Sequence, residues 1–459
     1  MRFINIYFMN NNIETENKGN FYALLPLFLF VLTFLGAGIY LNDFYALPSP
    51  IAVLLGIVLA LIMFKDSMNI KIATLLRGCG DDKILTMCLI YLLAGAFTVV
   101  CKATGSVDAI VQLGLQYISI HWLYAGVFII AAFLSIATGT SVGAIVALGA
   151  VVIGFADTAE VSLAILSASL LGGAMFGDNL SIISDTTIAA TQSLQVNMKD
   201  KFKQNILIAG PVALITIGVL LFQGFSLNDS IKLDTSDTIE IIKIIPYLLV
   251  LTLAVVGLNV FVVLFIGILA AGILGIYYGD FGLLEFAKLS YEGFTSMTEI
   301  FLLSLLTGGL AALVTRAGGI TFLINFITTK MNSKSAYFGI SGLVGVTNMA
   351  IANNTVSIII IGPIAKRLND QFKLNPKKVA SVLDIFACIV QGLLPYGAQS
   401  LIILSLAGGK INYLDLVSNV WYLWFLLIGT LIYIQISSKK TPLKPLKERE
   451  LFFEDGLTE

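Results

Sequence analysis

The sequence predicts an all-α, polytopic membrane protein with about ten spanning helices in two inverted repeats, each with a re-entrant hairpin and a broken helix. Composition is the first reason: 58% of the 459 residues are hydrophobic, 12% are charged and the mean hydropathy is +0.93. Soluble domains carry about 25% charged residues. Many apolar runs also approach the roughly 20 residues that a helix needs to cross a bilayer. Finally, polar interruptions recur in the same order in both halves.

The order of these runs divides the chain into six predicted parts. The N-terminal stretch lacks the apolar core and cleavage site of a signal peptide, so the first helix is expected to stay in the mature protein. The parts are a cytoplasmic N-terminal tail (1–20), a first transmembrane helix (21–47), repeat 1 (48–222), an extracytoplasmic loop with a connecting helix (223–257), repeat 2 (258–436) and a cytoplasmic C-terminal tail (437–459).

The first half combines uninterrupted apolar runs with two broken ones. Residues 105–118 are short and amphipathic, which is typical of a helix at the membrane interface. Two longer segments are interrupted by polar residues, 121–156 at TGTS (138–141) and 160–196 at GDNLSIISDTT (177–187). The remaining expectations are helices at 21–41, 48–64, 84–101 and 203–222 and a loop at 65–83.

The second half repeats this order. Residues 318–329 are the short interfacial candidate, and two broken segments follow, 336–366 at ANNT (352–355) and 380–407 at PYGAQS (395–400). The remaining expectations are a run at 244–279 split near 257–259, helices at 298–315 and 418–436, and loops at 223–243, 280–297 and 366–378.

The paired interruptions set a register between the halves. TGTS corresponds to ANNT at a numbering offset of 214, and FGDN (176–179) corresponds to YGAQ (396–399) at an offset of 220. Interruptions at matching places in two halves are the best sequence indication of a transporter binding site.

Charge favours one topology. If each first broken segment is a re-entrant hairpin, all but five of the 27 Lys and Arg lie on the N-terminal side; if it crosses fully, all but eight do. The positive-inside rule therefore favours hairpins, inverted halves and cytoplasmic termini. Full crossing of 121–156 and 336–366 stays open, because each arm is long for a helix that reaches only the midplane. In the hairpin topology the five exceptions are Lys102, Lys232, Lys243, Lys288 and Lys410.

The polar stretch 172–191 is the strongest site candidate. A carboxylate at membrane depth is costly and usually functional, and hard cations such as Na⁺ prefer oxygen ligands. On a continuous helix Asp178 and Asp185 lie two turns apart and face the same way, so the sequence predicts a Na⁺ site there. Alternatively, Asp185 only caps a helix end near water. The other candidates in this stretch are Asn179, Ser181, Ser184 and Thr186.

The other interruptions are expected to complete the site. Their hydroxyls and amides suit the tips of hairpins, although they could merely satisfy freed backbone groups. The candidates are Thr138, Thr140 and Ser141 in the first half, and Asn353, Asn354, Thr355, Gln399 and Ser400 in the second.

Three further intramembrane polar residues have separate expectations. Asn348 and Gln391 are predicted to form interhelical hydrogen bonds. Asp384 is expected to pair with Lys377 or Lys378, or else to belong to a proton path.

The residue types exclude several classes of function. The single histidine, His121, lies at a predicted interface, so a transported proton must ride on a carboxylate. Desolvation favours the protonated form of such a group, so a proton and a metal ion would compete for it. There is no nucleophile–base pair, phosphate loop, metal-spaced Cys/His cluster or nucleic-acid footprint. We therefore expect no enzyme and no cofactor, only transported Na⁺ and H⁺ and surrounding lipid.

GDNLSIISDTT, with the upstream TGTSVGAIVALGAVVIG, resembles the NhaC family of sodium/proton antiporters, and the resemblance extends from the second helix to the last. It implies inverted repeats, paired re-entrant hairpins, elevator-like motion and a homodimer. Asn179 stands where many members have Lys, which removes a cation from the centre. By this resemblance, family motif positions include Asp178, Ser181, Ser184, Asp185, Thr186 and 138–141.

Three functional hypotheses follow. The first is Na⁺/H⁺ exchange across a bacterial inner membrane by alternating access. The second keeps the fold but couples Na⁺ to a small organic acid or amino acid. The third is a channel or scaffold, which the paired interruptions disfavour because a channel usually needs a continuous lined pore.

Overall fold

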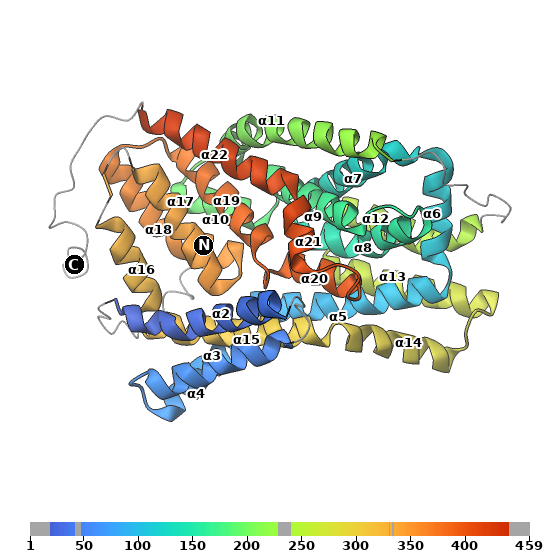
Figure 1. The fold of residues 1–459 in the computed structure, drawn as a ribbon, viewed down its shortest axis with the longest axis horizontal. Coiled ribbons are helices and arrows are strands. Elements are labelled where there is room, and N and C mark those ends of the chain that lie inside the picture. The colour runs from blue at the N-terminus through green and yellow to red at the C-terminus, as the bar shows by residue number, and fades with distance from the viewer. Residues whose placement is uncertain (1–18, 42–46, 228–239, 330, 333–334, 440–459) are drawn as a thin grey trace. The chain divides into compact units, whose positions relative to one another are not determined.

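The computed structural model describes residues 19–41, 47–227, 240–329, 331–332 and 335–439 (Figure 1). These residues form helices joined by short loops, and none of them lies in a β-strand. Ten of the described helical segments are long and apolar enough to cross a membrane. The predicted class, an all-α polytopic membrane protein, is confirmed.

The first half contains the predicted helices with the predicted breaks. The elements are η1 (Phe21–Leu24), α2 (Leu25–Tyr40), α3 (Ser49–Met63), α4 (Met68–Cys79), α5 (Asp82–Ala103), α6 (Ser106–Tyr117), η2 (Ile120–Trp122), α7 (Leu123–Thr138), α8 (Ser141–Thr158), α9 (Leu163–Leu180), α10 (Asp185–Leu194) and α11 (Met198–Phe225).

The second half follows the same succession. Its elements are η3 (Ile241–Ile244), α12 (Ile245–Val255), α13 (Val260–Tyr278), α14 (Leu283–Ser296), α15 (Thr298–Arg316), α16 (Gly319–Thr328), α17 (Ala336–Ile351), α18 (Asn354–Phe372), α19 (Pro376–Leu393), α20 (Ala398–Leu406), α21 (Tyr413–Asn419) and α22 (Trp421–Lys439).

Three predicted loops were wrong. Residues 65–83 contain α4, residues 280–297 contain α14, and α18 continues through the first part of 366–378. Charged residues keep these segments below the hydropathy of a membrane span, yet an amphipathic helix needs only one apolar face. The tails 1–18 and 440–459 and the centre of the predicted loop 223–243 lie outside the described residues.

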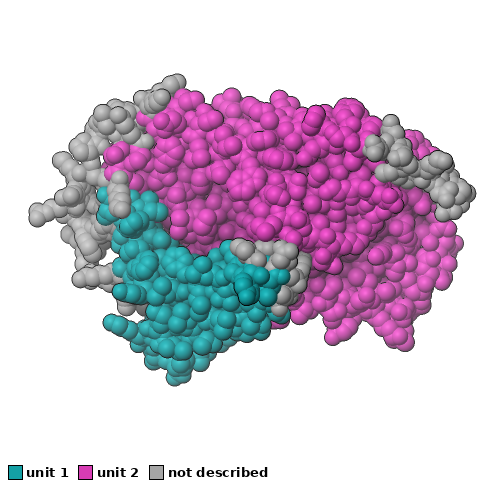
Figure 2. All heavy atoms as spheres, viewed as in Figure 1, with its two compact units in different colours: residues 1–81, 305–329 teal, residues 82–304, 330–459 magenta. Residues whose placement is uncertain are grey.

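The chain divides into two compact units (Figure 2). Unit 1 comprises Met1–Asp81 and Leu305–Thr329, and in it α2 packs along α3. Unit 2 comprises Asp82–Ser304 and Lys330–Glu459. It contains all four helices that flank the two tips and both broken helices, so every candidate site residue lies in unit 2.

Backbone geometry shows that the fold repeats at a constant offset in the numbering. Among the residues that the structure describes, left-handed φ outside glycine occurs at Glu160, Gln195, Ala352 and Lys373, and each has a left-handed partner 213 positions away. A left-handed φ is uncommon outside glycine, so four matched pairs indicate two copies of one fold. The pairs are Gly105 with Gly318, Gly139 with Ala352, Glu160 with Lys373, and Gln195 with Gly408.

Hydrogen bonds between helices repeat at the same offset. Ser135 donates to the Ala174 carbonyl at 2.7 Å, and its equivalent Asn348 donates to the Ala387 carbonyl at 2.8 Å. The amide of Ser162 likewise donates to the Tyr124 hydroxyl, and the amide of Asn375 donates to the Tyr337 hydroxyl, both at 3.2 Å. The Asn348 bond confirms that residue's predicted interhelical role.

This offset corrects the register between the interruptions. It places Thr140 opposite Asn353, whereas the predicted alignment at 214 placed it opposite Asn354. It also aligns α9 with α19 end to end, which places Asp178 opposite Gln391 rather than opposite Ala398 as the offset of 220 required. The offset of 220 aligns Gly177 of FGDN with Gly397 of YGAQ, whereas the offset of 213 aligns the ends of the two helices.

The short helix that follows each break packs against the other half of the chain. The first-half helix α10 packs on α18 and α19, and the second-half helix α20 packs on α8. Close contacts mark both places: Gly362 of α18 faces Ser193, and its repeat equivalent, Gly149 of α8, faces Leu406. Each broken helix therefore contacts the other half of the chain through the short helix after its break.

A close crossing of α5 on α14 yields a stability prediction. A Cβ on Gly95 would lie 2.7 Å from the Met297 Cγ and 2.9 Å from the Gly293 backbone carbon. Overpacking typically costs about 1–3 kcal/mol, so Gly95→Val should lower the thermal unfolding temperature in detergent. Gly218→Val is the matched control, since nothing lies near that position of α11. Equal unfolding temperatures for the two variants would contradict the crossing.

Candidate functional site

Two hydrogen bonds, one of them to α7, fix the backbone at the break in the first broken helix. α9 ends at Leu180, and Ser181 takes an extended conformation. The Ser181 hydroxyl donates to the Ile136 carbonyl at 3.0 Å, and Thr187 donates to the Ser181 carbonyl at 2.7 Å. The helix is therefore not continuous from Asp178 to Asp185, and the two carboxylates do not share one face.

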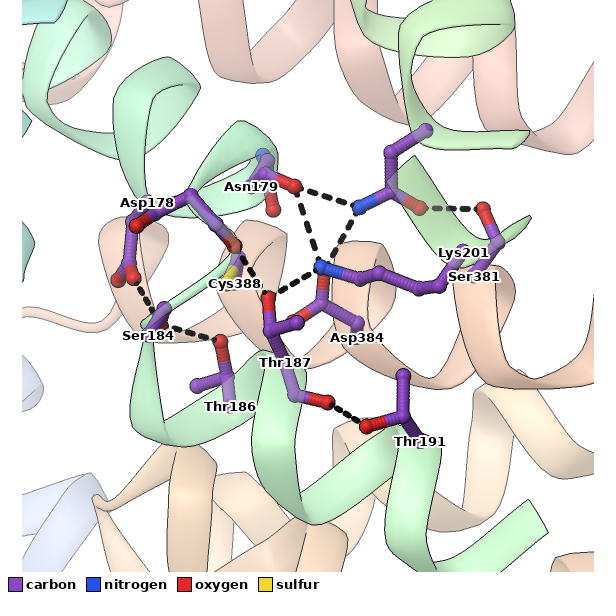
Figure 3. A network of polar contacts seen from close by, with 12 residues as sticks. Asp178, Asn179, Ser184, Thr186, Thr187, Thr191, Lys201, Ser381, Asp384 and Cys388 are labelled. Carbon is purple, nitrogen blue, oxygen red and sulfur yellow. Dashed lines mark hydrogen bonds and ion pairs between the residues drawn. The ribbon is translucent and has the colours of Figure 1, made fainter. Parts of the chain in front are cut away.

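Asp178 lies at this break with its carboxylate buried, at 4% exposure. The Ser184 hydroxyl donates to one carboxylate oxygen at 2.5 Å, and the Ser141 hydroxyl donates to the other at 2.9 Å. Ser184 also lies 3.0 Å from the Thr186 hydroxyl (Figure 3). Among the described residues each carboxylate oxygen accepts one hydroxyl hydrogen, which leaves a lone pair on each oxygen for a further ligand. Carboxylate and hydroxyl oxygens are the ligands that hard cations prefer.

A chain of amides connects Asp178 to the second broken helix. The Gln399 side-chain nitrogen donates to the Ser141 hydroxyl oxygen at 3.0 Å. Gln391 in turn donates from its nitrogen to the Gln399 side-chain oxygen at 3.0 Å. We call these residues the Asp178 cluster: Ser141, Asp178, Ser184, Thr186, Gln391 and Gln399. It joins the tip after α7 to both broken helices.

A second cluster surrounds a buried ion pair. The Lys201 ammonium lies 2.6 Å from a carboxylate oxygen of Asp384, with side-chain exposures of 1% and 0% (Figure 3). The same ammonium donates to the Thr187 hydroxyl at 2.6 Å and to the Asn179 carbonyl at 3.2 Å. Asn205 donates to both Asp384 and the Asn179 carbonyl, at 2.8 and 2.6 Å.

Ser381 completes this Lys201 cluster by donating to the Asn205 side-chain oxygen at 2.5 Å. The cluster comprises Asn179, Thr187, Lys201, Asn205, Ser381 and Asp384. Asn179 and Asp178 are neighbours in α9, so the two clusters lie on adjacent residues of one helix end.

The predicted partner of Asp384 was wrong. Lys377 pairs with Asp200 at 3.0 Å and Lys378 donates to Ser437 at 3.2 Å, while Asp384 faces inward to Lys201. Asp384 is more than two turns into α19, beyond the reach of the basic residues at that helix start. Lys201 was not among the predicted site residues, because it lies in the basic run KDKFK (199–203) between two apolar helices.

Asp185 lies away from Asp178 in a different environment. It begins α10, its side chain is 61% exposed, and its carboxylate lies 2.5 Å from the Lys83 ammonium. This arrangement fits the alternative in which Asp185 caps a helix end near water.

The remaining candidates hold the tips and the break of the second half. Thr140 and Asn353 cap α8 and α18 by accepting from Gly143 and Val356. Other contacts are Asn179 to the Tyr422 hydroxyl at 3.3 Å, Thr138 to the Thr140 carbonyl at 3.4 Å, Asn354 to the Cys388 sulfur at 3.8 Å and to the Thr355 amide at 2.9 Å, and Ser400 to the Gly392 carbonyl at 3.5 Å. These are mostly backbone-satisfying roles, as the alternative reading expected.

Comparison with known proteins places the chain among membrane antiporters. The Na⁺/H⁺ antiporter family matches residues 23–225 and 229–437. The malate-2H⁺/Na⁺-lactate antiporter of Bacillus subtilis is 25% identical over 413 residues, covering 83% of this chain and 86% of that one. The Na⁺/H⁺ antiporter NhaC of Alkalihalophilus pseudofirmus is 22% identical, covering 73% and 78%. The arginine/ornithine antiporter ArcD of Halobacterium salinarum is also 22% identical, covering 86% and 88%.

A solved structure aligns over most of the chain at low similarity. The Alcanivorax borkumensis YdaH transporter has a TM-score of 0.42 and 12% identity, covering 90% of this chain and 98% of that one.

Ten potential spans and two interrupted helices that meet at a buried carboxylate define a multi-pass secondary antiporter of a bacterial membrane. The chain belongs to the Na⁺/H⁺ antiporter family, as the resemblance to NhaC predicted.

Proposed function

We propose that this protein exchanges Na⁺ for H⁺ and that both ions bind at Asp178 in turn. The observation that carries the proposal is the buried Asp178 carboxylate, which accepts hydroxyl donors from the first tip and from its own helix break. An ionised carboxylate there stabilises a bare cation, and a bound proton removes that attraction. Competition for one group couples the two ions without a second binding site.

Charge balance supports a single monovalent ion. Lys201 and Asp384 neutralise each other, so Asp178 supplies the one net negative charge of the two clusters. A site with a net charge of −1 becomes neutral with one Na⁺ or one H⁺. The resemblance implies a lysine at the position of Asn179 in many family members. Here the Lys201 ammonium supplies a cation close to that position, since it lies 3.2 Å from the Asn179 carbonyl.

The remaining parts of this proposal concern topology. We place the chain in the bacterial inner membrane with cytoplasmic termini, with the two halves inverted and the tips as re-entrant hairpins, as the lysine and arginine distribution favours. The structural repeat supplies two equivalent broken helices, which suits alternating access around a fixed site. Six-part domain boundaries, a homodimer and the absence of a cofactor also stay predictions.

Na⁺-coupled exchange of a small organic acid or amino acid is the second candidate. The buried amide of Gln399, which reaches Asp178 through Ser141, could donate to a carboxylate. The buried tip residue Asn353 offers a second amide. Two relatives bear the names malate-2H⁺/Na⁺-lactate antiporter and arginine/ornithine antiporter, which supports an organic substrate as the second candidate.

Fluorescence dequenching in everted vesicles separates the two candidates. Vesicles are acidified by respiration in the presence of a pH-sensitive dye, and salts are then added. Na⁺ alone should collapse the pH gradient if the protein exchanges Na⁺ for H⁺. A response that requires malate, lactate or an amino acid would refute the first proposal and support the second. Vesicles without the protein provide the background.

A further inference from the structure

Gln391 occupies the same place in the second half as Asp178 does in the first. Under the repeat offset of 213, α9 and α19 start and end at equivalent positions, and these two residues are equivalent as well. Each lies in the last turn of its helix, directly before a break. The second half therefore presents an uncharged amide at the position where the first presents the carboxylate.

The Gln391 side chain is buried but not fully paired. It is 1% exposed, its nitrogen donates to Gln399, and its oxygen has no hydrogen-bond partner among the described residues. An unpaired buried oxygen costs free energy, so such an atom in a functional site calls for a ligand.

The direction of the hydrogen bonds from Asp178 to Gln391 determines which side-chain atom of Gln391 has no partner among the described residues. An ionised Asp178 can only accept, so Ser141 must donate to it and must accept from Gln399. Gln399 then offers its oxygen to Gln391, which uses its nitrogen. When Asp178 is ionised, the direction of these hydrogen bonds therefore leaves the Gln391 side-chain oxygen without a partner among the described residues.

We propose that the Gln391 side-chain oxygen is a ligand of the transported monovalent cation, together with Asp178. The inference deepens the proposed Na⁺/H⁺ exchange and rests on it. A neutral oxygen adds affinity for Na⁺ without adding charge, which keeps the site at one net negative charge. The register of the repeat explains why this ligand comes from α19.

Protonation of Asp178 would withdraw this ligand through the same chain. The protonated carboxyl donates to Ser141, Ser141 donates to the Gln399 oxygen, and the Gln399 nitrogen donates to the Gln391 oxygen. The two amide groups and the Ser141 hydroxyl turn about their terminal bonds in this change. One proton taken from water binds to the Asp178 carboxylate, and no other covalent bond forms or breaks. Proton binding thus removes both the charge and the neutral oxygen.

The groups that surround Asp178 leave Asp178 itself as the residue that binds the proton. α8 contributes Ser141, and the break and α10 contribute Ser184 and Thr186, all uncharged. Asp384 and Lys201, from α19 and α11, are the charged groups that act on Asp178, and they are already paired with each other.

The test compares Na⁺ dependence in proteoliposomes of the purified protein. Gln391→Leu removes the oxygen at similar volume and should raise the apparent KM for Na⁺ by about tenfold, with the maximal rate largely retained. Gln391→Asn keeps a neutral carboxamide with one methylene less and should raise the KM for Na⁺ less than Gln391→Leu does. Unchanged Na⁺ dependence in the Leu variant, or a KM for Na⁺ as high in the Asn variant as in the Leu variant, overturns the inference.

Asn348→Ser is the matched control. Asn348 is another buried amide with an unpaired oxygen among the described residues, and Ser135 is its equivalent with the same interhelical bond. Serine should preserve that bond and leave the KM for Na⁺ unchanged. Failure of the wild type itself to respond to Na⁺ would refute the proposed function instead.

Discussion

Asp178→Asn is expected to abolish Na⁺-dependent proton movement while the protein still inserts and folds. The amide is nearly isosteric and can still accept from Ser141, but it carries no charge and binds no proton. Loss of a buried charge partner costs about 3 kcal/mol or more, which corresponds to a decrease of roughly 100-fold in transport efficiency. Initial rates in proteoliposomes, with unfolding temperature as the folding check, measure this effect.

Asp185→Asn is the matched control for that variant. Asp185 is the other carboxylate of the same motif, yet it is 61% exposed and pairs with Lys83. Exposed pairs contribute about 0–1 kcal/mol, so exchange should change little. If Asp185→Asn lost exchange as fully as Asp178→Asn, the Na⁺ site would have to include both carboxylates, as the sequence suggested.

Lys201→Met is expected to destabilise the protein by about 3–5 kcal/mol, because it leaves the buried Asp384 carboxylate without its counter-charge. Asp384 is 0% exposed, and one of its oxygens already has no partner among the described residues. A lower unfolding temperature in detergent and a smaller yield of monodisperse protein would report the effect.

The double variant Lys201→Met/Asp384→Leu separates pairing from position. Replacing both charges by apolar groups is often neutral, so it should recover most of the lost stability. A double variant no more stable than Lys201→Met would show that the pair is not the reason for the loss. A single variant as stable as the wild type would contradict the buried ion pair.

The sequence predicted most of the fold because membrane spans and their interruptions are recorded in local composition. The breaks at 138–141, 177–187, 352–355 and 395–400 all fall at helix boundaries. α4 and α14 were missed because amphipathic helices have a low mean hydropathy. The register between halves was misjudged, since it depends on left-handed caps at residues such as Glu160 and Lys373 that composition does not reveal.

The site was predictable only in part. Asp178, Ser141, Ser184 and Gln399 come together because the interruptions that the sequence showed meet in space. The burial of Lys201 could not be predicted, since only the packing of α11 on α19 distinguishes this residue from the neighbouring Lys199 and Lys203. Asp185 was placed beside Asp178 because a continuous helix was assumed across the break. The contact between Lys201 and the Asn179 carbonyl could not be foreseen from spacing.

Proton release from the purified protein in weakly buffered detergent solution is the most direct measurement of competition at Asp178. Addition of Na⁺ should release close to one proton per chain at a pH where Asp178 is partly protonated, and the release should vanish in Asp178→Asn. Choline chloride should release none from either protein. Equal release from Asp178→Asn and the wild type, or no release from a wild type that transports Na⁺, would contradict the account.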